Sequence, residues 1–122
     1  MKITSFYPLI ATKHEGEMKE IFQALGFEIA HIKSDFDVIP SENSIMKDEL
    51  GHRVEFADLV DLFGTDKDTL MIRVNVDDLD GFVQLLTEKG FRTVVRDDTA
   101  SAKYCMMVSP YGLTIDLCEH LK

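Results

Sequence analysis

The sequence predicts an α+β fold built from two tandem copies of one β-α-β-β-β unit. The heptapeptide IFQALGF at 21–27 returns as LLTEKGF at 85–91, sixty-four positions later, with its Gly-Phe pair in register. Each heptapeptide ends an amphipathic helical pattern, and strand-like alternation and a hairpin pattern follow it. A copy of about sixty residues is too long for a solenoid repeat and too short for a separate domain. We therefore expect one domain over residues 1–122, with its function where the copies meet.

The first copy is expected to occupy residues 1–58. It opens with the apolar stretch Ile3–Ala11, which is rich in β-forming residues. The helix that follows is predicted from an i, i+3, i+4, i+7 stripe formed by Met18, Ile21, Phe22 and Leu25. Gly26 is expected to end it, because glycine suits the left-handed conformation just past a helix. Further strands are expected at 27–33, 44–48 and 53–58, with a loop at 35–43.

The second copy, residues 69–122, repeats this order after a linker at 59–68. A strand at 70–76 leads through the capping pair Asp77-Asp78 to a helix, whose apolar stripe is Leu79, Phe82, Val83 and Leu86. Gly90 ends this helix, and a strand is expected at 91–96. The last hairpin joins 104–108 to 113–118 through the turn Ser-Pro-Tyr-Gly at 109–112. The apolar part of the linker is interpreted as buried, with a short packed helix or an intersubunit contact as alternatives.

Composition excludes several classes of function. The net charge is −9, and both halves are acidic, which argues against nucleic acid or an anionic membrane surface as a partner. No apolar run approaches the roughly 20 residues of a membrane span, and the N-terminus lacks the pattern of a secretory signal. The two cysteines, Cys105 and Cys118, are expected to be reduced. We therefore expect a cytoplasmic protein that needs no cofactor in order to fold.

Two motifs carry a resemblance to a known family. ALGFEI follows the first helix at 24–29, and SPYGLTIDLCE forms the last hairpin at 109–119. Within a duplicated β-α-β-β-β unit, they resemble the vicinal oxygen chelate superfamily, which includes glyoxalase I, extradiol dioxygenases, fosfomycin-modifying enzymes and bleomycin-binding resistance proteins. The likeness spans nearly the whole chain. It implies two modules whose curled mixed sheets surround an open cavity, often completed by a second chain.

Strand alternation sorts the side chains into a helix-packed face and a cavity face. In the strand at 70–76 the even-numbered residues are all apolar, which turns Met71, Arg73 and Asn75 toward the cavity. The last strand turns Asp116 inward in the same way. The ligand-binding residues that we predict are Tyr7, Leu9, Met46, Arg53, Glu55, Met71, Arg73, Asn75, Met107 and Asp116.

Metal-dependent relatives place ligands at four of these positions, which the resemblance maps onto Tyr7, Glu55, Met71 and Asp116. Both acids are kept, and both histidines are replaced. Because a thioether is a poor ligand for a hard or borderline divalent ion, we expect no metal. The four histidines are interpreted as surface residues, although a hairpin slip of three residues would bring His52 toward Glu55.

The leading hypothesis is a metal-independent protein that binds a small organic ligand, similar to the bleomycin-resistance branch and working as a homodimer with the ligand between chains. An arginine would hold the carboxylate or phosphate of an anionic ligand. The alternative is a divergent lyase or dioxygenase in which Glu55 and Asp116 hold a divalent ion, so the sequence leaves open whether the protein is an enzyme.

Three blander interpretations also stay open. Arg73 paired with Asp116 and Arg53 paired with Glu55 would form an inert polar seam. A regulatory module would use the apolar linker instead of a cavity. A ferredoxin-like β-α-β-β-α-β fold would share both helices, but it leaves too few places for the two hairpins.

Overall fold

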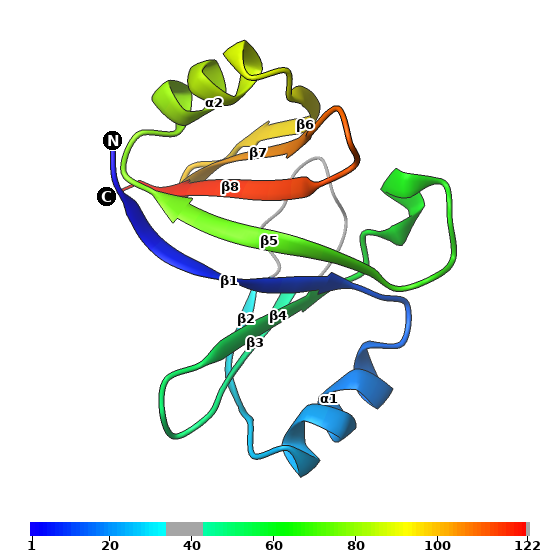
Figure 1. The fold of residues 1–122 in the computed structure, drawn as a ribbon. Coiled ribbons are helices and arrows are strands. Elements are labelled where there is room, and N and C mark those ends of the chain that lie inside the picture. Colours follow the sequence, from blue (N-terminus) through cyan, green and yellow to red (C-terminus); the bar gives the residue numbers. More distant parts are fainter. Residues whose placement is uncertain (34–42, 122) are drawn as a thin grey trace. The chain divides into compact units, whose positions relative to one another are not determined.

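The computed structural model describes residues 1–33 and 43–121 and contains both predicted modules (Figure 1). The first module comprises β1 (Ile3–Ala11), α1 (Glu15–Ala24), β2 (Glu28–Lys33), β3 (Asn43–Lys47) and β4 (Arg53–Ala57). The second comprises β5 (Thr69–Val76), α2 (Leu79–Glu88), β6 (Arg92–Asp98), β7 (Ala102–Val108) and β8 (Thr114–His120). A short 3₁₀ helix, η1 (Val60–Phe63), lies between them in sequence. The α+β class is confirmed; the loop predicted at 35–43 falls outside the described residues, apart from Asn43 in β3.

Both modules have the same strand order, β2-β3-β4-β1 in the first and β6-β7-β8-β5 in the second. The first and last strands of each module are parallel, and the other pairs are antiparallel. Leu9 lies opposite Glu55 in the first module, as Arg73 lies opposite Asp116 in the second. Leu9 and Arg73 are sixty-four residues apart, and Glu55 and Asp116 are sixty-one apart, which are the two offsets of the internal repeat. Equivalent residues of the two copies are therefore paired in the same strand register.

The chain groups into two compact units, one formed by residues 7–70 and the other by residues 1–6 with 71–122. β1 consequently begins in one unit and ends in the other. The N-terminal end of β1 is held within its unit by two hydrogen bonds, from Lys2 N to Asp77 Oδ1 (2.7 Å) and from Asp77 N to Lys2 O (3.1 Å). None of the described helices is long and apolar enough to cross a membrane.

The two helices end in the same way. Gly26 and Gly90 have φ angles of +101° and +97°, a backbone conformation that residues with a side chain rarely adopt. The N–H of the next residue, Phe27 or Phe91, donates a hydrogen bond to the carbonyl five residues earlier, at 2.9 and 3.0 Å. This is the Schellman arrangement, and it satisfies carbonyls that the helix end would leave unpaired. At the start of α2, Asp78 accepts a hydrogen bond from Gly81 N at 3.1 Å, as the capping prediction requires.

Equivalent side chains also build the two hairpin turns. Asp48 Oδ1 accepts hydrogen bonds from the N–H groups two and four residues later, at 3.1 and 2.8 Å. Ser109 Oγ does the same at 3.2 and 2.9 Å. Asp48 Oδ2 in addition contacts His52 Nδ1 at 2.7 Å. These bonds fix the register of β3 with β4, so the slip that would bring His52 toward Glu55 does not occur.

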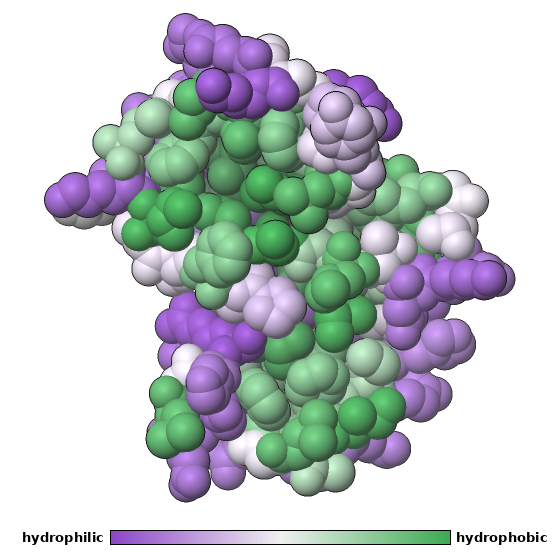
Figure 2. All heavy atoms as spheres, in the orientation of Figure 1, coloured by the Kyte–Doolittle hydropathy of each residue, from purple (hydrophilic) through white to green (hydrophobic). Residues whose placement is uncertain are grey.

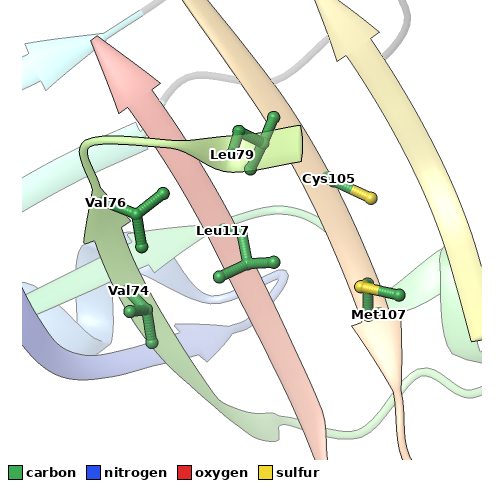
Figure 3. Close-up of a cluster of buried hydrophobic side chains, with 6 residues drawn as sticks. All are labelled: Val74, Val76, Leu79, Cys105, Met107 and Leu117. Atoms are coloured by element: carbon green, nitrogen blue, oxygen red, sulfur yellow. The ribbon is translucent and has the colours of Figure 1, made fainter. Parts of the chain in front are cut away.

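Each helix covers one face of its own module. Under α2 lies a buried cluster shown in Figure 3, which consists of Val74, Val76, Leu79, Cys105, Met107 and Leu117. Under α1 lies a smaller cluster of Met46, Val54 and Phe56, against which Met18 and Phe22 pack. Phe22 makes edge-to-face contacts with Phe27 and Phe56, at centroid distances of 5.4 and 5.2 Å.

Three residues that the sequence places against a core are exposed instead. Ile21 and Leu25 are 53% and 65% exposed, and Figure 2 shows apolar side chains at the surface over α1. Of the four residues in the predicted apolar stripe, Met18 and Phe22 pack against the cluster under α1. Leu70 is 68% exposed and lies outside the α2 cluster, against which Ile72 packs.

Alanine at the two helix-ending glycines should distinguish backbone strain from crowding. A Cβ at Gly26 meets nothing within 4 Å, whereas one at Gly90 comes within 3.0 Å of Pro110 Cγ. We expect Gly26→Ala to lower the free energy of unfolding by about 1–2 kcal/mol through φ alone, and Gly90→Ala to lower it more. Urea denaturation of both variants measures this difference. An equal or smaller loss at Gly90 would contradict the packing described.

Candidate functional site

The sheet face opposite each helix, here called the polar face of that module, carries buried polar side chains. In the first module the phenol of Tyr7 on β1 donates a hydrogen bond to Glu55 Oε1 on β4, at 3.1 Å. Both residues are buried, with exposures of 5% and 0%. Leu9 lies opposite Glu55 in register and is also fully buried. A carboxylate at this depth needs hydrogen-bond donors, and Tyr7 supplies one.

The polar face of the second module holds a buried ion pair. Arg73 Nη1 on β5 donates to Asp116 Oδ2 on β8 at 3.2 Å, and Arg73 Nε donates to Asn75 Oδ1 at 3.0 Å. The side chains of Arg73 and Asp116 are 1% and 9% exposed. The guanidinium also lies over the ring of Tyr104, 5.5 Å from its centroid. Tyr104 is a member of this cluster that the sequence analysis missed; strand alternation at 104–108 could have indicated it.

Met71 is fully buried at the start of the same face of β5, two residues before Arg73. Within each module the structure thus brings together the predicted residues of its own polar face. In the first module these are Tyr7, Leu9 and Glu55, and in the second they are Met71, Arg73, Asn75 and Asp116.

The predicted positions of Met46 and Met107 on the cavity face are wrong. Met46 lies opposite Val54 in register, in the cluster under α1, and Met107 lies opposite Ile115, in the cluster under α2 (Figure 3). In each antiparallel pair, the residue directly opposite the acid is the one that comes immediately before the methionine. Ile45 and Met106 therefore share the polar faces, because they lie directly opposite Glu55 and Asp116.

Arg53 does not form the ion pair with Glu55 that one interpretation of the sequence predicts. Its guanidinium lies over the ring of Tyr7, 5.8 Å from the centroid, and Arg53 is half-buried at the start of β4. In the part of the chain that the structure describes, no carboxylate lies within ion-pair distance of it. The Arg73–Asp116 half of the expected seam is present, and the Arg53–Glu55 half is absent.

The comparisons with known proteins identify the fold. No family model matches the chain, and no curated protein matches it in sequence. Among solved structures, methylmalonyl-CoA epimerase from Mycobacterium tuberculosis is similar over 98% of this chain and 90% of its own, with a TM-score of 0.71 and 14% identity. A glyoxalase/bleomycin resistance protein/dioxygenase superfamily member from Vibrio splendidus is similar over 98% of this chain and 100% of its own (TM-score 0.59, 15% identity). A glyoxalase I variant from Zea mays matches 97% of this chain and 43% of its own length (TM-score 0.66, 15% identity).

The chain has the vicinal oxygen chelate fold. This confirms the fold that the two sequence motifs indicated. At these identities the likeness establishes the fold alone, so any activity has to be argued from the side chains.

The residues that the resemblance maps onto metal-ligand positions are, taken one by one, poor ligands for a divalent ion. Glu55 accepts a hydrogen bond from Tyr7, and Asp116 is paired with a guanidinium that a metal ion would repel. Met71 offers a thioether, which is a soft ligand. Among the residues described, no three of His, Cys, Asp and Glu are grouped in a way that could hold a metal ion.

The two cysteines do not form a disulfide bond across the last hairpin, and both are buried. Cys105 lies opposite Leu117 on the α2 side, and Cys118 lies opposite Tyr104 on the polar face. Burial raises the pKa of the Cys105 thiol, and its hydrogen bond with Thr93 acts in the opposite direction. Cys105 therefore lacks the lowered pKa that is typical of a reactive cysteine.

Removing one partner of the buried ion pair should cost far more stability than removing both. Arg73→Met leaves Asp116 buried beside no guanidinium, and we expect a loss of about 3–5 kcal/mol in the free energy of unfolding. The double variant Arg73→Met/Asp116→Leu should recover much of that loss. Chemical denaturation of both variants measures the effect.

Lys13→Ala is the matched control, because its pair with Asp61 (3.0 Å) is exposed and should contribute nothing measurable. A double variant no more stable than Arg73→Met alone would show that the pair does not act as a unit.

Proposed function

We propose that this protein binds a small organic ligand without a metal ion, in the manner of the bleomycin-binding resistance proteins that share its fold, and that it works as a homodimer in the cytoplasm. The observation that carries the proposal is that Asp116, at one of the expected metal positions, is held in a buried ion pair with Arg73. At another expected position, Glu55 Oε1 accepts a hydrogen bond from the Tyr7 hydroxyl. A metal-dependent lyase or dioxygenase needs those oxygens as ligands.

The composition of the polar faces supports an organic ligand. Methionine adapts to irregular shapes, and tyrosine offers an apolar ring with a polar tip. Met71 and Met106 lie on the polar face of the second module, and Tyr7 lies on that of the first. Ligand sites in proteins combine such apolar contacts with a few fixed polar groups. Within the second module Arg73, Asn75 and Asp116 are such groups, and within the first module Glu55 is one.

A thermal-shift screen with EDTA present tests the proposal. The library should contain drugs, aromatic acids and thiol conjugates, each at several concentrations. We expect at least one compound to raise the melting temperature, since a ligand at one hundred times its Kd adds about 2.7 kcal/mol to the free energy of unfolding. The same shift without EDTA is the control. Stabilisation by divalent metal ions alone, with a flat response to every organic compound, would overturn the proposal.

Light scattering coupled to gel filtration tests the homodimer. We expect a mass of twice the 13.9 kDa of one chain, unchanged by EDTA. A mass of 13.9 kDa at micromolar concentration would show that one chain is sufficient.

A further inference from the structure

Two cations face each other where β3 and β4 meet their hairpin turn. Lys47 and Arg53 are directly opposite in the antiparallel register, so both side chains lie on the polar face of the first module. Like charges placed directly opposite in a sheet repel and destabilise it. This pair occurs in a chain whose net charge is −9.

The described carboxylates near the pair form no ion pair with either cation. Asp48 is bound to the turn N–H groups and to His52, and Glu55 accepts the Tyr7 hydroxyl. Glu28 lies on the other side of Lys47 in the β2–β3 register. Within the described residues, neither Lys47 nor Arg53 has an ion-pair partner within 4.0 Å.

The internal repeat shows that the fold itself does not require these charges. At an offset of sixty-one residues, the position of Lys47 is taken by Val108 and that of Arg53 by Thr114, again directly opposite each other. The second module therefore builds the same end of the hairpin with two uncharged residues. A structural requirement of the hairpin does not explain the cations of the first module.

The geometry of Arg53 suits anion recognition. Its guanidinium lies over the Tyr7 ring, 5.8 Å from the centroid, and the Tyr7 hydroxyl donates a hydrogen bond to Glu55, which orients the ring. In the described residues Arg53 makes no side-chain hydrogen bond, which leaves its planar fork of N–H donors available. Such a fork matches the two oxygens of a carboxylate or phosphate group. Arg73, by contrast, already donates to Asp116 and Asn75.

We propose that Arg53, positioned by Tyr7 and assisted by Lys47, is the anchor for the carboxylate or phosphate group of the ligand, which is therefore a small organic anion. This inference rests on the proposed function and adds the chemical class of the ligand. Arg53 binds the anionic group through its paired N–H donors, and Lys47 adds a second positive charge from the neighbouring strand. Binding of the anion also relieves the repulsion between the two cations.

The test compares matched ligands on matched variants. Benzoate and phenyl phosphate present the two anionic groups, and benzyl alcohol is their neutral counterpart; together with the anions that stabilise the protein in the screen, each is titrated at constant ionic strength. The variants are Arg53→Ala, Arg53→Lys and Arg92→Ala. Arg92 is an exposed cation on β6 in the other unit, so its loss changes the net charge equally.

We expect anions to bind the wild type at least tenfold more tightly than Arg53→Ala, with Arg53→Lys between them and Arg92→Ala within twofold of the wild type. Benzyl alcohol should bind at least tenfold more weakly than either anion. Anion binding unchanged in Arg53→Ala, or neutral organic compounds binding as well as anions, would overturn the anchor and leave the proposed function standing. Failure of every organic compound to bind would overturn both.

Discussion

The buried ion pair between Arg73 and Asp116 is the interaction on which the chemistry of this protein depends. Taking two charges out of water is costly, and the cost is offset only when the pair stays together with further hydrogen bonds. Arg73 meets that condition by also donating to Asn75 and lying over Tyr104. A cation at Asp116 would have to displace a guanidinium that is 1% exposed. The pair therefore engages a carboxylate that the sequence resemblance maps onto a metal-ligand position.

The two modules show how one backbone plan carries different side-chain chemistry. Strand order, helix ends and turn hydrogen bonds are repeated almost position by position. The side chains across the parallel strands differ. The first module places Leu9 opposite Glu55, and the second places Arg73 opposite Asp116. Glu55 consequently depends on Tyr7 from the same pair of strands. The duplicated scaffold fixes where the groups lie, and the identity of the groups decides what each face can bind.

Much of this arrangement could be predicted from the sequence, because it follows from local patterns. The glycines at 26 and 90, the capping Asp78 and the turn at 109–112 each have a local physical cause, and each is where it was expected. The alternation in β5 correctly placed Arg73 and Asn75 together. The faces of Met46 and Met107 were not predictable in this way, since they depend on which residues pair across a hairpin. The contact of Arg53 with Tyr7 joins β4 to β1, and no pattern within one strand reveals a contact between strands.

Elemental analysis of protein purified without chelator tests the central claim most directly. The ion pair at Asp116 and the thioether at Met71 predict less than roughly one tenth of an equivalent of zinc, nickel, iron or manganese per chain, with no difference between the wild type and Glu55→Ala. One equivalent of a divalent metal in the wild type, lost in Glu55→Ala, would contradict the account.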